Sequence, residues 1–292
     1  MSIKTNSIVI LTIAYHSQPS LLSLGRDLAR QSSHPDRWIV VDNSPHSAEK
    51  INLNAPFPIS VIRGEEGAGF SEGCNQGLDL LLTQDWDGWV WLLNPDICLK
   101  DTCTIANLQR TIVSLPFNSL LGTSVFDSAE NLEKSAGWFD PGLNFRRRRV
   151  SPQLITSSHD QPVSVDWISG CSMLLKPSSH KKEPRFEVSF PLYYEDMDFC
   201  LRLSREDVPI FWIPFVSVGH QKGEGSNTSF SRRIRLSSCS YIRFLQRHRP
   251  GLVLFLRTIR ILSNALIRLP ITPRRSFAVL QGCFEAYLEP LK

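Results

Sequence analysis

The sequence lacks the cysteine patterns of disulfide-rich and metal-thiolate proteins. Its seven cysteines among 292 residues form no CxxC pair, have no nearby histidine ligands and mostly fall within apolar stretches. This scatter excludes a disulfide scaffold and is typical of reduced core cysteines in a cytosolic protein. The seven are Cys74, Cys98, Cys103, Cys171, Cys200, Cys239 and Cys283.

The sequence also has no export signal and no long apolar run. It enters an apolar strand at Ile8 without a basic region, an extended apolar core or a small-residue cleavage site. In the carboxyl-terminal part the longest apolar run, residues 251–256, ends at Arg257 and is too short to span a membrane. We therefore expect a cytoplasmic protein, and 42% hydrophobic residues are sufficient for a large core.

A dinucleotide-binding motif is absent as well. The glycine-rich run at 67–73 has three residues between its second and third glycines, where the dinucleotide motif has two, and it follows the third predicted strand instead of the first. The segment after the first strand, residues 12–16, contains no glycine that would let a pyrophosphate approach. These departures argue against a nicotinamide or flavin enzyme.

The first half of the sequence alternates short apolar runs with helical patterns. That order predicts a parallel sheet covered by helices. Polar residues stand at the strand ends, where open parallel sheets bind their ligands, namely Thr12, Asp42 and Asp96. The predicted strands are 8–13, 38–41, 59–62 and 89–93, and the predicted helices are 21–29, 71–82 and 102–113.

The second half is less regular. We predict a polar loop over 127–162, a strand pair near 163–176, an acidic helix, and two short strands that end at His220. A polar segment at 221–226 follows, which could close over a diphosphate.

Residues 193–203 place three carboxylates at the start of the acidic helix. Phe199, Cys200 and Leu203 recur at helical spacing and predict a buried face. The carboxylates could supply a general base, but acids in a first turn also complement the helix dipole in proteins of any function. The three are Glu195, Asp196 and Asp198.

A second candidate site is the Asn94-Pro95-Asp96 turn, which follows a strongly apolar strand. Proline restrains the turn so that Asp96 projects at the strand end. A carboxylate there can hold Mg²⁺ or Mn²⁺, which proteins bind through one or two carboxylates together with substrate phosphates. The same three residues also occur in ordinary turns that bind no metal. A lone histidine such as His220 can likewise have a role in the fold alone.

The carboxyl-terminal part is strongly basic. Residues 231–275 contain eleven arginines and no aspartate or glutamate. A basic amphipathic helix of this kind can lie on an anionic membrane, or it can pack on its own domain with the arginines in solvent. The apolar stripe of this helix is Leu252, Phe255, Leu256, Ile259, Leu262 and Leu266.

Together these segments resemble the inverting glycosyltransferases of family 2, especially the rhamnosyltransferase-like bacterial members. The resemblance covers roughly residues 7–226 and is carried by Thr12 and Tyr15 at the first strand, VVDNS at 40–44, GFSEGCNQG at 69–77, LLNPD at 92–96, VDWISGC at 165–171, YEDMD at 194–198 and His220. It implies a single α/β domain of the A type, with a mostly parallel mixed central sheet flanked by helices. The implied division is a nucleotide-binding half at about 1–126, an acceptor-side half at 127–229 and a basic helical tail at 230–292.

The resemblance also implies roles for individual residues. Asp196 matches the catalytic base, and Asp96 with His220 matches the site of a divalent cation, Mg²⁺ or Mn²⁺. Asn94 replaces the first acid of a full DxD motif. The implied donor-binding residues are Thr12, Tyr15, Asp42, Asn75 and Asn94, and the implied acceptor-side residues are Trp167, Gly170 and Glu195.

The chemistry of sugar transfer needs these residue types. Loss of a nucleoside diphosphate builds negative charge that a cation at Asp96 would neutralise, and Asp196 would take the proton of the acceptor hydroxyl. The sequence leaves open in which direction the pKa of Asp196 is shifted. Glu195 and Asp198 would raise it, whereas Arg202 and the helix dipole would lower it.

The partners that follow from the resemblance are a nucleoside-diphosphate sugar, with dTDP-L-rhamnose as one candidate, and a glycan or lipid-linked acceptor. An anionic membrane surface is a further candidate partner, and we expect no nucleic acid. A glycoside hydrolase and a catalytically silent scaffold remain as alternatives. A hydrolase would need two carboxylates flanking the bond and would not use a metal at a sheet edge.

Overall fold

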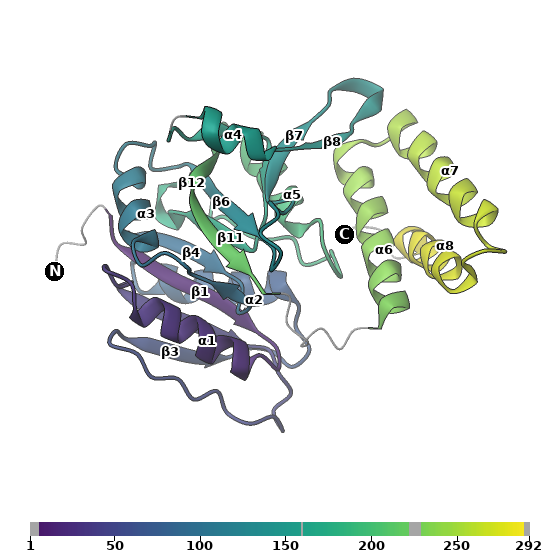
Figure 1. The fold of residues 1–292 in the computed structure, drawn as a ribbon. Coiled ribbons are helices and arrows are strands. Elements are labelled where there is room, and N and C mark those ends of the chain that lie inside the picture. Colours follow the sequence, from purple (N-terminus) through teal and green to yellow (C-terminus); the bar gives the residue numbers. More distant parts are fainter. Residues whose placement is uncertain (1–5, 159, 222–228, 289–292) are drawn as a thin grey trace.

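The computed structural model describes residues 6–158, 160–221 and 229–288. Figure 1 shows a twisted central sheet with helices on both faces and a unit of three helices at one side. An antiparallel hairpin projects from the sheet region toward that unit.

The first half has the predicted alternation of strands and helices, and all four predicted strands and three predicted helices are confirmed. Two further strands, β5 (Ile97–Cys98) and β6 (Leu120–Phe126), complete this half. The confirmed elements are β1 (Ile8–Ala14), α1 (Gln18–Ala29), β2 (Arg37–Asp42), β3 (Ile59–Arg63), α2 (Phe70–Thr83), β4 (Trp89–Leu93) and α3 (Thr104–Ile112).

The second half contains more structure than the sequence pattern indicates. The acidic helix forms as predicted. The elements are β7 (Ala136–Phe139), η1 (Gly142–Asn144), β8 (Arg147–Arg149), α4 (Pro152–Ser157), β9 (Val163–Ser164), β10 (Trp167–Ile168), β11 (Ser172–Leu175), η2 (Pro177–Ser179), α5 (Glu195–Ser204) and β12 (Ile210–His220).

Two predictions for this half are wrong. The polar loop over 127–162 contains the β7–β8 hairpin and α4, because the arginine run pairs with β7 while Arg148 lies over the ring of Trp138 at 5.7 Å. The two short strands before His220 are one strand, β12, with a register shift between Ile213 and Ser217. Pro214, which has no N–H to donate, lies within this irregular stretch.

The strands form one large mixed sheet and one small antiparallel sheet. The large sheet has the order β3-β2-β1-β4-β11-β6-β12-β5, with β9 paired to β12, and the small one has the order β10-β7-β8. β1 to β4 run parallel, as do β6 and β12, whereas β11 is antiparallel to both of its neighbours. The predicted mixed sheet is confirmed, and the carboxyl ends of β1, β2 and β4 meet at one edge.

The glycine-rich run allows α2 to lie close against β1. A Cβ on Gly73 would lie 2.6 Å from Ile13, and one on Gly77 would lie 2.4 Å from Leu11. The buried Asn43 side chain donates to the carbonyls of Ala68 and Gly69, at 3.1 and 2.9 Å, and so fixes the turn that enters α2. Glycines 73 and 77 therefore serve helix–sheet packing.

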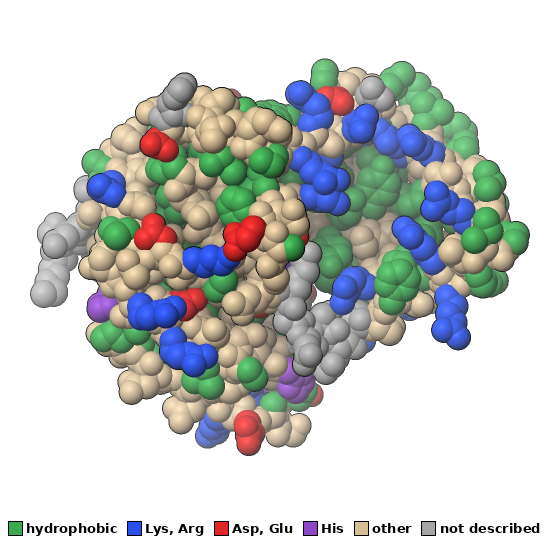
Figure 2. Space-filling model, in the orientation of Figure 1, with side chains coloured by type: hydrophobic (Ala, Val, Ile, Leu, Met, Phe, Trp, Pro, Cys, Tyr) green, Lys and Arg blue, Asp and Glu red, His purple; other side chains and the backbone are tan. Residues whose placement is uncertain are grey.

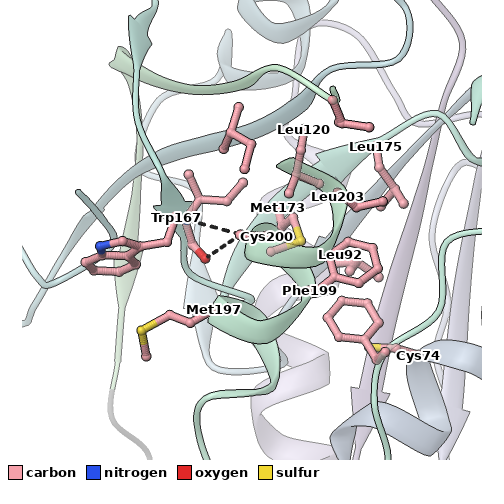
Figure 3. Packing of buried hydrophobic residues seen from close by; sticks show 14 of the residues in the cluster. Cys74, Leu92, Leu120, Trp167, Met173, Leu175, Met197, Phe199, Cys200 and Leu203 are labelled. Atoms are coloured by element: carbon pink, nitrogen blue, oxygen red, sulfur yellow. Dashed lines mark hydrogen bonds between the residues drawn. The ribbon is translucent and has the colours of Figure 1, made fainter. Parts of the chain in front are cut away.

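The predicted buried face of α5 is confirmed. Phe199, Cys200 and Leu203 are at most 3% exposed. Figure 3 shows them packed against Leu92, Met173 and Leu175 of the central sheet and against Cys74 of α2. The Cys200 thiol also contacts the backbone of Ile168 in β10, so α5 is held against both sheets.

The chain ends in three helices, α6 (Phe230–His248), α7 (Leu252–Ile267) and α8 (Pro273–Leu288). α6 packs on the rest of the molecule, with Phe244 and Leu245 at 2% and 1% exposure in the main core. α7 does not bury its apolar stripe: Phe255 is 59% exposed and Leu266 is 58% exposed. The self-packing interpretation therefore fits α6, while the stripe of α7 faces solvent.

The hydropathy of the helices bears on membrane insertion. No helix within the described part of the chain is both long and apolar enough to span a bilayer.

The different burial of two phenylalanines gives a test of this arrangement. Phe244→Ala should lower the free energy of unfolding by ~3–5 kcal/mol, since it leaves a cavity in the core, whereas Phe255→Ala should change it by less than ~0.5 kcal/mol. Urea unfolding of the full chain measures both. Equal, small losses would show that α6 is not part of the core.

Candidate active site at the carboxyl ends of the strands

Asp96 and His220 lie together beyond the ends of β4 and β12. One carboxylate oxygen of Asp96, Oδ2, is 3.2 Å from His220 Nε2. The other, Oδ1, has no exposed surface and no hydrogen-bond partner. A buried carboxylate oxygen without a partner is costly, and it suits a ligand that is a cation or a hydrogen-bond donor.

Glu133 is a member of this group that the sequence analysis misses. Its carboxylate lies 3.2 Å from His220 Nδ1. Burial alone lowers the pKa of His220, but hydrogen bonds and charges from Asp96 and Glu133 outweigh it and raise this pKa. A neutral imidazole that donates Nδ1–H to Glu133 presents its Nε2 lone pair beside Asp96, the arrangement common to metal-bound histidines.

The donor set fits a divalent cation with few protein ligands. The described residues contain no group of three or more His, Cys, Asp and Glu side chains around one point. A carboxylate and an imidazole, Asp96 and His220, remain as candidate ligands. Mn²⁺ and Mg²⁺ accept such sparse sites when phosphate oxygens supply the other positions.

Asp196, in the first turn of α5, is the second candidate carboxylate. Its Oδ2 accepts a hydrogen bond from the backbone N–H of Gly170 at 3.1 Å, and its Oδ1 accepts one from the N–H of Met197 at 2.8 Å. Burial raises the pKa of Asp196 despite these hydrogen bonds and the positive charge of Arg147. The direction that the sequence leaves open is therefore set by burial and not by the neighbouring acids.

Glu195 lies beside Asp196 in a similar environment. Its Oε2 has no exposed surface and no hydrogen-bond partner. Burial, with the neighbouring charge of Asp196, raises the pKa of Glu195 well above its ordinary value. The two carboxyl groups therefore disfavour each other's ionisation.

Asp198, the third acid of the segment, has a structural position. It is fully buried and accepts hydrogen bonds from His248 Nε2 at 2.8 Å and from Arg202 Nε at 2.7 Å, with Arg247 at 3.2 Å. Burial alone would raise the pKa of Asp198, but these partners lower it. Since Arg202 pairs with Asp198, it does not reach Asp196 as a direct partner, and Asp198 has no exposed surface for a substrate.

Cys171 lies in the segment between the two candidate carboxylates. Its neighbour Gly170 donates its N–H to Asp196, and its own carbonyl accepts from the N–H of Asn94, two residues before Asp96. Burial, with smaller contributions from the charges of Asp196, Asp96 and Glu133, raises the pKa of the Cys171 thiol to about 12. The Asn94 side chain also contacts this sulfur, at 3.6 Å.

An open cavity adjoins the cation-binding side of the site. It has a volume of about 440 Å³. The predicted loop at 221–226 lies outside the described residues except for Gln221, whose N–H donates to the carbonyl of Asp96 at 2.9 Å. The cavity is lined by Asp96, Lys100, Gly219, His220 and Gln221, and by Ser20 and Ser23 of α1.

The residues expected to bind the donor occupy different environments. Tyr15 is 51% exposed directly after β1, and the Asp42 carboxylate at the end of β2 pairs with Arg63 and accepts from the N–H of Ser44. Thr12, by contrast, is fully buried and accepts from the indole of Trp38 at 3.0 Å.

The Asn75 side chain holds another segment in place. It makes two hydrogen bonds to the backbone of Phe186, at 2.8 and 2.9 Å. Asn75 thus clamps α2 to the segment before α5. The polar groups of Thr12 and Asn75 thus form hydrogen bonds within the fold. Tyr15, Asp42 and Asn94 lie at the strand ends.

Of the residues expected on the acceptor side, Glu195 and Gly170 adjoin Asp196. A Cβ on Gly170 would be a tight contact, 3.2 Å, with the ring of Phe70 and would lie 3.6 Å from Asp196. Trp167 is buried, and the guanidinium of Arg147 lies 5.1 Å from its ring centre. Arg147, which the sequence analysis assigns to a loop, is therefore a positive group beside the candidate base.

Comparison with known proteins gives one family and several relatives. Residues 8–177 match the sequence profile described as glycosyl transferase family 2. Rhamnosyltransferase WbbL of Escherichia coli (strain K12) is 33% identical over 85 residues, which cover 29% of this chain and 32% of that protein. The low-salt glycan biosynthesis hexosyltransferase Agl10 of Haloferax volcanii is 25% identical over 213 residues, or 73% of this chain and 66% of that protein.

Two solved structures share the fold at low sequence identity. GalNAc-T7 with UDP, GalNAc and Mn²⁺ has a TM-score of 0.55 at 11% identity, over 82% of this chain and 49% of that one. The mannosyltransferase PcManGT of Pyrobaculum calidifontis, in complex with GDP-Man and Mn²⁺, has a TM-score of 0.55 at 9% identity, over 96% and 86%. The expected A-type fold is confirmed.

The raised pKa of Glu195 gives a pH-dependent stability effect. The ionised form of Glu195 destabilises the folded state. This loss of folding free energy is complete above the raised pKa of Glu195 and disappears as the pH falls toward the ordinary pKa of a glutamate. Glu195→Gln should therefore stabilise the fold by ~1 kcal/mol or more at about pH 8 and have little effect at about pH 4. Thermal unfolding across this pH range measures the difference, with the exposed Glu49→Gln as control. A stabilisation independent of pH would contradict the assignment.

Proposed function

Because this chain belongs to glycosyl transferase family 2, we propose that it is an inverting glycosyltransferase that moves a sugar from a nucleoside diphosphate to an acceptor hydroxyl. The observation that carries the proposal is that one short segment, Gly170 and Cys171, contacts both carboxylate positions at the carboxyl edge of the sheet: Gly170 donates to Asp196, and Cys171 accepts from the N–H of Asn94, two residues before Asp96. One carboxylate has a free oxygen for a cation, and the other is a base whose pKa is raised.

Asp196 is the proposed general base. A pKa raised by burial makes the ionised carboxylate a stronger proton acceptor. The N–H groups of Gly170 and Met197 hold its two oxygens in place. The acceptor oxygen attacks the anomeric carbon as its proton passes to Asp196, the bond to the diphosphate oxygen breaks, and attack from the opposite face inverts the configuration.

Asp96 and His220 are the proposed cation-binding pair. A divalent cation there would neutralise charge on the departing diphosphate. Glu133 holds His220 in the orientation in which Nε2 faces Asp96. Both solved structures named above contain Mn²⁺, which supports this assignment and leaves the choice between Mg²⁺ and Mn²⁺ to experiment.

The donor and acceptor are finer proposals. The likeness to rhamnosyltransferase WbbL supports L-rhamnose carried by a deoxythymidine diphosphate. Residues of about 1–126 would bind the donor and those of about 127–229 the acceptor, and 230–292 are the basic helical tail, whose first helix packs in the main core. We propose a glycan or lipid-linked acceptor, handled at the cytoplasmic face of a membrane, with Arg147 beside the base suited to an anionic group on that acceptor.

A donor screen is the direct test of the proposed function. Purified protein is incubated with a panel of nucleoside-diphosphate sugars and acceptors, with and without Mn²⁺, and nucleoside diphosphate release is measured. We expect release that depends on one donor class, on acceptor and on the cation. Cation-independent hydrolysis of a glycoside would favour the hydrolase alternative instead.

Asp96→Asn should weaken Mn²⁺-dependent binding of the nucleoside diphosphate by at least tenfold, because the diphosphate loses its charged bridge to the protein (about 1.4 kcal/mol per factor of ten). Calorimetric titration with and without Mn²⁺ measures the loss, and Asp85→Asn, an exposed position, is the control. Wild-type affinity in the Asp96 variant would remove this residue from the site.

Asp196→Asn should leave donor affinity within a fewfold of wild type and reduce transfer by roughly two to four orders of magnitude, the usual loss when a general base is removed. Initial rates and donor titrations separate the two effects. Glu195→Gln is the companion variant: if it abolishes transfer while Asp196→Asn remains active, Glu195 is the base.

A further inference from the structure

The three carboxyl-terminal helices enclose a second cavity outside the candidate active site. Its volume is about 550 Å³, and it lies between α6, α7 and α8. Three arginines line it, one from each of α6 and α8 and one from the end of α7: Arg233, Arg275 and Arg268. Side chains of Ser237, Asn264 and Thr272 add hydroxyl and amide groups to its wall.

The chemistry of this cavity suits an anion. None of the described residues that line it is an aspartate or a glutamate. Within the described ranges, neither Arg268 nor Arg275 has a carboxylate partner. Guanidinium groups that converge with hydroxyl and amide groups, and have no acid among them, offer paired N–H donors to phosphate oxygens.

Highly exposed apolar side chains stand next in sequence to residues that line the cavity. Ile267 precedes Arg268 and is 72% exposed, Ile271 precedes Thr272 and is 79% exposed, and Phe277 follows Ser276 and is 62% exposed. Figure 2 shows hydrophobic side chains along the outer edge of this unit with a row of Lys and Arg side chains beside them. A phosphate site bordered by protruding apolar groups matches the two chemistries of a phospholipid.

We propose that this cavity binds the phosphate headgroup of an anionic membrane lipid while the exposed faces of α7 and α8 enter the acyl region of the bilayer. The occupant is a lipid and not a second copy of the chain. Residues 231–275 carry eleven arginines and no acid, so a symmetric pairing of this face would bring like charges together. An anionic surface removes that repulsion and covers the apolar groups at the same time.

Lipid binding by this cavity rests on the proposed function in one respect, which is that the membrane would be the place where the enzyme meets its acceptor. Tyr193, two residues before the first residue of α5, lines the same cavity. The headgroup site is therefore close in the fold to the helix that carries Asp196. A bilayer docked here would hold the active site near membrane-linked acceptors.

Flotation with lipid vesicles tests the inference on the full chain. Wild-type protein should float with phosphatidylcholine vesicles that contain phosphatidylglycerol and stay behind with phosphatidylcholine alone. Arg268→Gln with Arg275→Gln should lower the partition coefficient by about 25-fold, at about fivefold for each basic side chain near an anionic surface. Ile267→Ser with Ile271→Ser should weaken flotation as well. Arg110→Gln and Val113→Ser, both exposed on the sheet domain, are matched controls and should float like wild type.

Three outcomes would overturn the proposal. Wild-type protein would float equally well with neutral and with anionic vesicles, or the arginine variant would float like wild type. The third is a dimer in sedimentation analysis that Ile267→Ser with Ile271→Ser dissociates. Saturable binding of inorganic pyrophosphate without vesicles, lost in the arginine variant while flotation persists, would assign the cavity to a soluble anion. If wild-type protein binds nucleoside diphosphate but does not float with the anionic vesicles, this inference is wrong and the proposed function stands. If wild-type protein floats but transfers no sugar from any donor, the proposed function is wrong and this inference stands.

Discussion

The arrangement of the site depends on holding two adjacent carboxylates, Glu195 and Asp196, in half-buried positions. Burial raises the pKa of both, the charge of Asp196 raises that of Glu195 further, and backbone N–H groups donate to both oxygens of Asp196. Such a pair is unfavourable unless the surrounding structure holds it in place. Asp198 provides that support, since its contacts with Arg202 and His248 hold its charge in the core and fix α5 against α6. The proposed catalytic acids and the structural acid thus differ by partners and not by residue type.

The proposed cation site, at the other end, also has a carboxylate that the surrounding residues hold in place. Asp96 retains an oxygen without a partner, while Glu133 uses the second ring nitrogen of His220. A group that is incomplete within the protein is what a ligand can complete. Burial raises the pKa of the Cys171 thiol to about 12, so the sulfur beside Asn94 stays uncharged.

The sequence predicts the parts of this protein that depend on local pattern. Apolar runs and helical spacing predict the elements of the first half. The order of the motifs along the chain predicts the family, which the match over residues 8–177 confirms. The shared site of Asp96, Asp196 and His220 is a prediction from the same order. Glu133 is not predictable in this way, because its role comes from a contact across 87 residues of sequence. The β7–β8 hairpin is missed because its arginines pack on aromatic rings, which polarity alone does not reveal. The polar groups of Thr12 and Asn75 turn inward for the same reason, since their partners lie far along the chain.

The contact between Asp198 and His248 has a consequence for biosynthesis. The two residues are 50 positions apart, and the histidine comes second. A ribosome would release α5 well before α6, so in the nascent chain Asp198 has Arg202 of its own helix as a partner but still lacks His248 and Arg247. Because a charge with incomplete partners is poorly tolerated in a core, α5 should settle only when α6 arrives, and a prematurely terminated polypeptide would lack an organised base.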